Sequence, residues 1–187
     1  MQGSSGKTSR KTRCAIVNIL TVEPNRFDAQ KRLNAISREQ AVEIAKSFLK
    51  TPYILGGRVK GAGVDCGTIL ALYLQECGFC KKEDFDDVGI YHHDWFQHDR
   101  SERYLLRLMR HAPRILDTIC RGTVDAKPGT LALFRVVGSK IFNHGGIITR
   151  WPFMINAVHP CVKEINCVNH WLTGQREMVL FDPWSNE

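Results

Sequence analysis

The chain has 187 residues, 43% of them hydrophobic, which is enough for one domain with a substantial core. No apolar run approaches the length of a membrane span, and the N-terminus lacks the apolar stretch of a secretory signal. The seven cysteines are odd in number and irregularly spaced, which argues against a disulfide-stapled secreted module. We therefore expect synthesis in a cytoplasm, with reduced thiols and without a signal peptide.

The net charge of +7 is moderately basic, and part of it lies in an opening rich in Ser, Gly and Thr. Residues 1–13 are predicted to form a disordered basic arm, and residues 14–187 a single domain. Such an arm can contact a polyanion, but it is more often a solvated tail, so nucleic acid is not an expected partner. The cations of the arm include Lys7, Arg10, Lys11 and Arg13.

Two elements are predicted before the central loop. Residues 14–22 (CAIVNILTV) are apolar and β-branched, which predicts a strand or an extended packing segment. Ser37, followed three residues later by Gln40, forms a capping-box pattern at the start of a helix. This helix is expected to stop before Pro52. Its predicted buried stripe consists of Ala41, Ile44, Ala45 and Phe48.

Residues 51–78 combine a glycine-rich loop with a buried helix that ends at Gly78. Cys66 is predicted at or near the first helical turn, where unpaired backbone N–H groups and the helix dipole favour a thiolate. Cys66 is therefore a candidate nucleophile, whereas Asp65 is better suited to capping the helix. The helix is predicted from the spacing of Ile69, Leu70, Tyr73, Leu74 and Cys77.

A long insert at about residues 79–123 is rich in charge, histidine and aromatic residues. Within it, residues 91–99 (YHHDWFQHD) are expected to form a loop or short strand, residues 101–111 a helix, and residues 115–119 another short element. The polar side chains at 91–99 could bind a metal or line a groove, although an exposed polar surface is the commoner role. They are His92, His93, His98, Asp94 and Asp99.

The remaining sequence has the period of β-strands. Apolar segments separated by turn signals predict four strands, at 131–137, 142–151, 154–158 and 178–181. Helices followed by an antiparallel sheet predict the α+β class.

His144 is the candidate base for Cys66, because it opens an apolar strand directly after Asn143. Asn156 lies on the next predicted strand, and a hairpin would place it beside His144. In this pairing Asn156 would accept the Nδ1–H of His144 and leave Nε2 facing Cys66. His159 is the alternative orienting residue, but residues 156 and 158 face one side of a strand and 159 the other.

The stretch from Ser37 to Val158 resembles the NlpC/P60 cysteine peptidases. The insert and the closing FDPW resemble the branch of that family found in phage tails and gene transfer agents. The matching motifs are Thr51-Pro52-Tyr53, Gly56-Gly57, Asp65-Cys66, Lys127-Pro128-Gly129, His144-Gly-Gly-Ile-Ile and Ile155-Asn156-Ala157.

The resemblance implies a papain-like fold, with the nucleophile at a helix start and helices packed on a small antiparallel sheet. It implies that Cys66 attacks an amide, that His144 is the base, and that Asn156 stands where the family usually has histidine. Tyr53 matches a tyrosine that helps to stabilise the oxyanion. The implied reaction is hydrolysis of a peptidoglycan stem-peptide bond, typically between D-glutamate and a diamino acid. No cofactor is implied.

Two departures from the family pattern concern the surroundings of Cys66. Gly67 and Thr68 follow the cysteine, where the family commonly has serine and then glycine, and the loop at 57–64 is long. Neither change removes a catalytic group. The pair Cys77 and Cys80 has CxxC spacing, but it falls at a helix end and lacks a second close pair, so neither redox nor zinc chemistry is expected.

The resemblance also implies how the protein reaches its substrate. Delivery on a phage-like tail tip would bring it to the host cell wall, with other tail-tip proteins as partners. A structural tail-tip adaptor or plug with the same fold is the first alternative. A thiol acyltransferase or amidase acting on lipid or small amides is the second, but the sequence offers neither a large apolar pocket nor a membrane-facing segment for it.

Overall fold

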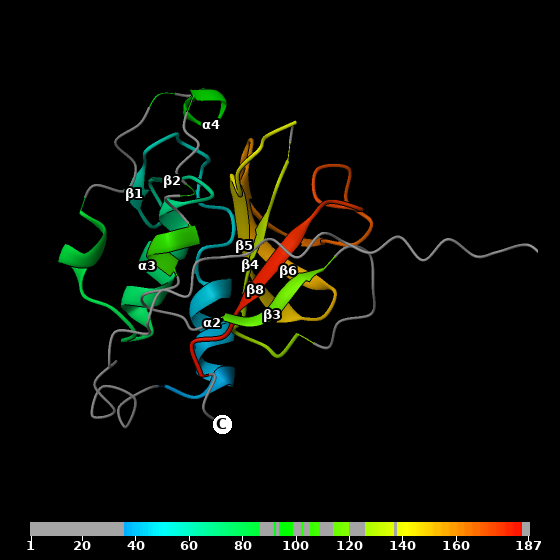
Figure 1. Ribbon diagram of the computed structural model, residues 1–187. Helices are drawn as coiled ribbons and strands as arrows, with labels where there is room; N and C mark the ends of the chain where they lie inside the picture. The colour runs from blue at the N-terminus through cyan, green and yellow to red at the C-terminus, as the bar shows by residue number, and fades with distance from the viewer. Residues whose placement is uncertain are drawn as a thin grey trace, which may run out of the picture.

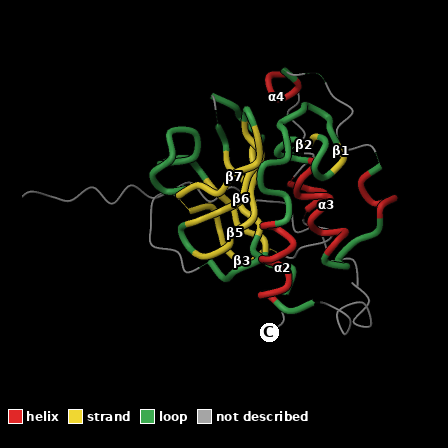
Figure 2. The backbone as a smooth tube through the Cα atoms, turned by 180° about the vertical axis from the view of Figure 1, so that it is seen from behind, coloured by secondary structure: helices red, strands yellow, loops and turns green. Residues whose placement is uncertain are grey.

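The computed structural model describes eight parts of the chain: 36–86, 92, 94–98, 102, 105–108, 114–119, 126–136 and 138–184. The predicted arm at 1–13, the predicted strand at 14–22 and much of the insert lie outside these ranges. Helices and an antiparallel sheet form two layers, which Figure 1 shows from the front and Figure 2 from behind. The predicted α+β class is therefore confirmed. The described residues include no helix that is long and apolar enough to cross a membrane.

Helix α2 (Arg38–Lys46) begins with the predicted capping box. Gln40 N–H donates to Ser37 Oγ at 3.3 Å, and Ser37 N–H donates to Gln40 Oε1 at 2.8 Å. Two otherwise unpaired N–H groups are thereby satisfied, which stabilises the first turn. The predicted stripe packs against the core, with Ala41, Ala45 and Phe48 fully buried and Ile44 half-buried.

Helix α3 (Thr68–Glu76) is the buried helix predicted after Cys66. Ile69, Tyr73 and Leu74 are fully buried, and Gly78 has a φ of +79°, a left-handed conformation that glycine adopts without strain. Before α3, the glycine-rich loop contains a short hairpin of β1 (Arg58–Val59) and β2 (Gly63–Val64).

The insert is partly described. It contains the 3-10 helix η1 (Lys82–Phe85), the short helix α4 (Trp95–His98) and a helical stretch at 105–108. Residues 91–99 were expected to be a loop or short strand, so α4 corrects that expectation. One turn of helix is too short to leave a periodic pattern in the sequence. The expected element at 115–119 is strand β3 (Arg114–Ile119).

The sheet has six antiparallel strands in the order β3-β8-β4-β5-β6-β7. Four of these strands were predicted at 131–181, with ends shifted by a few residues. The sequence reading missed β7, in which charged residues interrupt the apolar pattern at an edge of the sheet. The remaining strands are β4 (Leu131–Phe134), β5 (His144–Arg150), β6 (Phe153–Val158), β7 (Cys161–Asn166) and β8 (Met178–Phe181).

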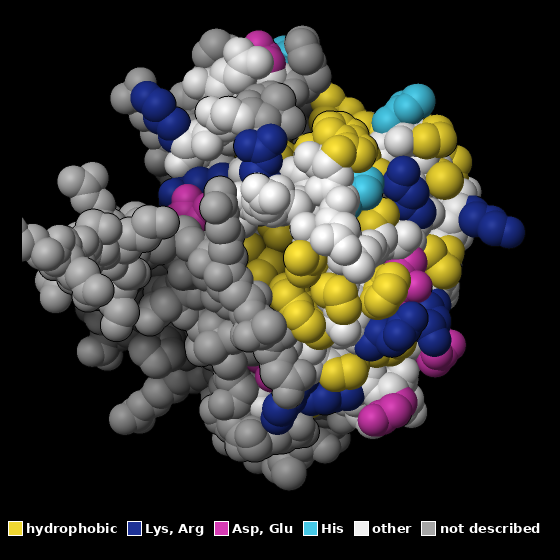
Figure 3. Space-filling model, turned by 90° about the vertical axis from the view of Figure 1, so that its right-hand side faces the viewer, with side chains coloured by type: hydrophobic (Ala, Val, Ile, Leu, Met, Phe, Trp, Pro, Cys, Tyr) yellow, Lys and Arg dark blue, Asp and Glu magenta, His cyan; other side chains and the backbone are white. Residues whose placement is uncertain are grey.

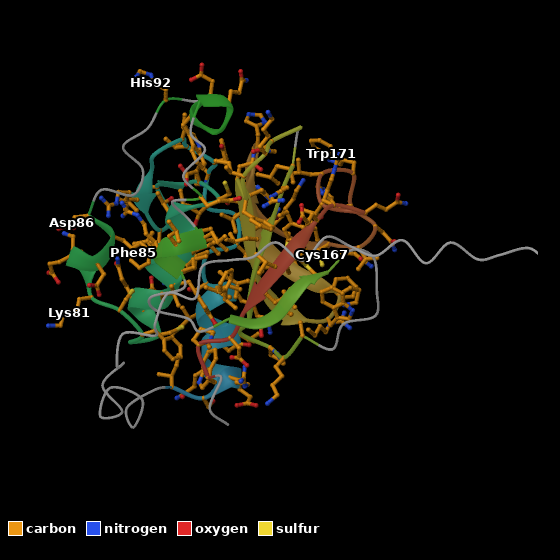
Figure 4. The ribbon with its side chains drawn as sticks, viewed as in Figure 1. Lys81, Phe85, Asp86, His92, Cys167 and Trp171 are labelled. Carbon is orange, nitrogen blue, oxygen red and sulfur yellow. The ribbon has the colours of Figure 1, made fainter. Side chains whose placement is uncertain are left out.

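The sheet buries a cluster of apolar side chains on each face. Leu131 and Leu133 of β4 pack in the larger cluster, with α2 and α3, whereas Ala132 and Phe134 pack in a second cluster. The segment at 167–175 supplies Cys167 and Leu172 to the second cluster, and Figure 4 shows Cys167 on the side of the sheet away from α3.

The segment after β8 returns to the start of α2. Arg38 Nη2 lies 2.8 Å from Asp182 Oδ2, and both side chains are largely buried. The Arg38 guanidinium also lies 4.7 Å from the ring centroid of Trp184. This ion pair closes the end of the molecule opposite to the glycine-rich loop (Figure 1).

Candidate active site

Asp65 organises the backbone around Cys66. The Asp65 carboxylate is fully buried and accepts hydrogen bonds from the N–H groups of Gly67 and Thr68, each at 2.9 Å, and of Gly56 at 2.7 Å. Thr68 Oγ1 in turn accepts the Asp65 N–H at 2.8 Å. The predicted capping role of Asp65 is therefore confirmed. Because it also holds Gly56, Asp65 ties the glycine-rich loop to the start of α3.

Cys66 directly precedes Gly67, the N-cap residue of α3, and is partly buried. Its Sγ lies 3.7 Å from the carbonyl oxygen of Asn143, to which the thiol donates. Burial and the neighbouring Asp65 carboxylate raise the pKa of the Cys66 thiol to about 12, although the N–H groups of Gly145, Cys66 and Gly67 lower it. The expectation that the helix start favours a thiolate is thus wrong, since desolvation outweighs the backbone N–H groups.

Close packing of α3 on β5 brings Cys66 to the strand that carries His144. A Cβ at Gly145 would lie 2.7 Å from Leu70 Cδ1 of α3 and 2.8 Å from Leu133 Cδ2 of β4. A larger residue at 145 would require these two leucine side chains to shift. The Cys66 sulfur consequently lies against the backbone of residues 143–145, at the beginning of β5.

His144 and Asn156 are joined in the interior. The Asn156 Nδ2 and His144 Nε2 atoms lie 3.0 Å apart, with Asn156 fully buried and His144 6% exposed. Asn156 is paired with Gly146 in the β5–β6 ladder, so the predicted hairpin is confirmed. A Cβ at Gly146 would lie 3.2 Å from the Cβ of Asn156, so the absence of a side chain at Gly146 leaves room for the Asn156 side chain.

The ring nitrogen that contacts Asn156 is Nε2, whereas the sequence reading had assigned Nδ1 to this contact. If His144 acts as a base, Nδ1 is then the nitrogen that can accept a proton. The Asn156 Oδ1 atom is buried, and no residue in the described part of the chain forms a hydrogen bond with it. A 180° rotation of the carboxamide would place Oδ1 at His144 Nε2, where it could accept the Nε2–H and leave Nδ1 free to take a proton.

Burial and, to a smaller extent, the nearby His170 lower the pKa of His144 to about 4. The imidazole is therefore neutral at pH 7 and able to accept a proton. His170 was not singled out in the sequence, because a lone histidine in a turn-rich segment carries no periodic or motif signal. Its Nδ1 accepts the Leu172 N–H at 3.4 Å.

Tyr53 is half-buried at the entrance to the glycine-rich loop. Burial, Cys66 and Asp65, in that order, raise the pKa of its hydroxyl to about 12. The hydroxyl therefore stays protonated at neutral pH and can donate a hydrogen bond close to Cys66. The backbone N–H of Tyr53 is fixed by the carbonyl of Pro160 at 2.9 Å.

The other candidate residues lie elsewhere. His159 is exposed in the turn between β6 and β7, whereas Cys77 and Cys80 are buried. His92 is exposed, and Figure 4 shows it beyond α4, while His93 lies outside the described residues. Among the described residues, no group of His, Cys, Asp and Glu side chains could hold a metal ion.

A surface cavity of about 620 Å³ lies beside α2 rather than at Cys66. It is lined by Ile36, Glu39, Gln40, Val42, Glu43, Ile44, Pro128 and Thr149.

The face of the sheet in Figure 3 shows hydrophobic side chains interleaved with lysines and arginines. The positive charge on this face is therefore scattered, unlike the continuous basic patch typical of nucleic-acid binding. The most exposed aromatic side chain described is Trp171, which is 75% exposed.

Comparisons with known proteins find similarity at the level of solved structures, to eight chains. No protein-family model and no curated protein matches the sequence. Among solved structures, the chain is similar to one described as the structure of NlpC1 from Trichomonas vaginalis, with 18% sequence identity and a TM-score of 0.47. The similarity covers 75% of this chain and 42% of that chain, so this chain spans less than half of its length. These values are too low to assign the chain to a family.

Proposed function

We propose that the protein is a cysteine peptidase that hydrolyses an amide bond in peptidoglycan stem peptides. The observation that carries the proposal is the buried His144–Asn156 pair at the beginning of β5, where the Cys66 sulfur lies against the same strand. The motifs around Cys66, His144 and Asn156 add the resemblance to NlpC/P60 peptidases. Cys66 is the proposed nucleophile, His144 the base and acid, and Asn156 the residue that orients His144.

The resting site holds neutral groups, since the pKa of Cys66 is raised to about 12 and that of His144 is lowered to about 4. The thiol proton must therefore move to His144 as sulfur attacks the substrate carbonyl, rather than before substrate binds. This step requires the S–H group to turn from the Asn143 carbonyl toward the imidazole. We propose that this rotation of the S–H group takes place when substrate binds.

The remaining steps follow from the same residues. The S–C bond forms while the carbonyl oxygen becomes an oxyanion, which the Cys66 N–H and the Tyr53 hydroxyl stabilise. His144 then donates its proton to the leaving amine as the C–N bond breaks. A water molecule gives a proton to His144, attacks the thioester and releases the acid and the Cys66 thiol.

The resemblance supplies the substrate class and the route of delivery. We propose cleavage between D-glutamate and a diamino acid, by a papain-like enzyme carried on a phage-like tail tip to the host cell wall. The alternative is a structural tail-tip adaptor with the same fold. Its distinguishing property would be an unreactive Cys66, although the three residue types needed for catalysis are present.

The proposal is tested by incubating purified peptidoglycan with the protein and with Cys66→Ala. Soluble stem-peptide fragments should appear only with the natural sequence, and mass spectrometry of the fragments names the bond that is cut. Cys161→Ser is the matched control, because Cys161 is another partly buried free cysteine. If the natural protein releases nothing and a thiol-reactive probe also leaves Cys66 unlabelled, the adaptor alternative replaces the peptidase.

A further inference from the structure

The residues that lead into β5 connect the two halves of the proposed site. The Asn143 carbonyl accepts the Cys66 thiol proton, and the next residue is His144. The Asn143 side chain is fixed because its Oδ1 accepts the Val136 N–H at 2.9 Å, and its backbone N–H donates to Phe134 at 3.1 Å. A shift of this segment would change the position of both the sulfur's partner and the imidazole.

Glu102, from the insert, holds this segment from outside the sheet. Its Oε2 accepts the backbone N–H of Phe142 at 2.9 Å, one residue before Asn143. Its Oε1 lies 3.1 Å from Arg135 Nη2. Glu102 also has a φ of +50°, in the left-handed region that a residue other than glycine adopts only at a cost.

Arg135 links Glu102 to a second carboxylate, that of Glu177. Its Nη1 lies 2.6 Å from Glu177 Oε2, and its guanidinium lies 4.4 Å from the ring centroid of Phe142. The guanidinium thus bridges two carboxylates and covers the side chain of the residue whose N–H Glu102 binds. All three charged side chains are largely buried, with 22 to 28% of each exposed, so their hydrogen bonds are stronger than those of exposed pairs.

We propose that Glu102 is a positioning residue for catalysis, which acts through Phe142 to hold Asn143 and His144 in place beside Cys66. This inference rests on the proposed function, since it assigns a task to the insert in that reaction. The insert would then contribute to catalysis through the Glu102 carboxylate, which positions the catalytic residues without contacting substrate. Errors of about 1 Å in the placement of catalytic groups can slow a reaction roughly 100-fold.

The first test compares turnover of Glu102→Ala and Glu102→Gln with the natural protein. Glu102→Ala should lower kcat roughly 10- to 100-fold with KM within about twofold, because it removes the acceptor for Phe142 N–H without touching substrate. Glu102→Gln keeps one carbonyl oxygen for that N–H and should restore a measurable part of kcat. A kcat of folded Glu102→Ala within about twofold of the natural protein would overturn the inference.

Asp182→Asn is the matched control, because Asp182 belongs to another largely buried arginine–carboxylate pair at the opposite end of the molecule. Thermal unfolding of each variant identifies loss of stability. Asp182→Asn should lower the unfolding temperature and leave kcat of the folded protein unchanged. If it lowers kcat as much as Glu102→Ala does, the effect is a general loss of stability and the positioning role is refuted.

The second test does not depend on peptidase activity. Alkylation of Cys66 by iodoacetamide, followed by mass spectrometry across pH, reports the thiol directly. Loosening the Asn143 carbonyl and admitting water should shift the pH midpoint of labelling downward in Glu102→Ala, while Asp182→Asn leaves it in place. If no variant cleaves peptidoglycan but the midpoint shifts, the positioning role stands and the proposed function fails. If the natural protein cleaves peptidoglycan and Glu102→Ala changes neither kcat nor the midpoint, the proposed function stands and the positioning role fails.

Discussion

The nucleophile side and the base side of the proposed site are held in different ways. Around Cys66, the Asp65 carboxylate accepts three backbone N–H groups, and Thr68 returns a fourth contact. Around His144, Asn156 is the one hydrogen-bond partner of the imidazole among the described residues, and none of these residues pairs with its buried Oδ1. The nucleophile side is therefore fixed by several hydrogen bonds, whereas the base side depends on one carboxamide, whose orientation decides which ring nitrogen of His144 can accept a proton.

This difference assigns separate tasks to the two sides. A fixed backbone at residues 65–68 keeps the sulfur and its N–H groups in place for an oxyanion. With its Oδ1 turned to Nε2, Asn156 can accept the Nε2–H and stabilise His144 once Nδ1 gains a proton, because an imidazolium has two N–H donors. Substitutions should then affect stability on the nucleophile side and rate or pH dependence on the base side.

Asp65→Ala should have the largest effect on stability. It leaves the buried N–H groups of Gly67 and Thr68 and the partly buried N–H of Gly56 without their acceptor, and we expect a loss of about 3 kcal/mol in the free energy of unfolding. Urea unfolding measures this loss. Glu43→Ala is the control, since the exposed Glu43–Lys46 pair should contribute less than about 0.5 kcal/mol. Equal losses in the two variants would show that Asp65 does not organise the loop.

His144 should make stability depend on pH. Its pKa is about 4 in the folded protein and 6.5 in the unfolded chain, so the unfolded state binds more protons between these values. The free energy of unfolding should fall as pH drops from about 6.5 to 4, by roughly 3 kcal/mol from this group. His144→Gln should lack this part of the decline. Parallel pH curves for the two proteins would contradict a buried neutral His144.

Asn156→Ala should lower kcat roughly 10- to 100-fold, because it removes the side chain that contacts the His144 ring at Nε2. Asn156→His should keep more activity, since a ring nitrogen can also accept the Nε2–H. His159→Ala is the control and should match the natural protein, because His159 is exposed in a turn. A larger loss in His159→Ala than in Asn156→Ala would reverse the assignment of the orienting residue.

Gly145→Ala should have a smaller effect on stability, about 1 to 2 kcal/mol, because the new Cβ meets Leu70 and Leu133. The same substitution in a Leu70→Ala background should cost less, since the cavity accepts the methyl group. A double-mutant cycle of unfolding free energies measures this coupling. Strictly additive losses would mean that α3 does not pack against Gly145 as closely as the structure shows.

Elements with local signals could be predicted from the amino-acid sequence. The capping box of Ser37 and Gln40 gave the start of α2, and the apolar spacing after Cys66 gave α3, because both depend on neighbours within one or two helical turns. The pairing of His144 with Asn156 was also predictable, since a tight hairpin fixes which positions meet. Strand β7 and helix α4 could not be predicted, because the apolar pattern of β7 is interrupted by charged residues and α4 is too short to show a period.

The chemical environment of the candidate site depends on how the layers pack together. Burial and Asp65 raise the pKa of the Cys66 thiol, whereas the helix start was expected to lower it. His144 contacts Asn156 through Nε2, whereas Nδ1 was expected. The link from Glu102 to Phe142 spans 40 residues of sequence and leaves no local pattern. Desolvation, ring orientation and distant contacts all depend on how the layers pack, which no local spacing of residues contains.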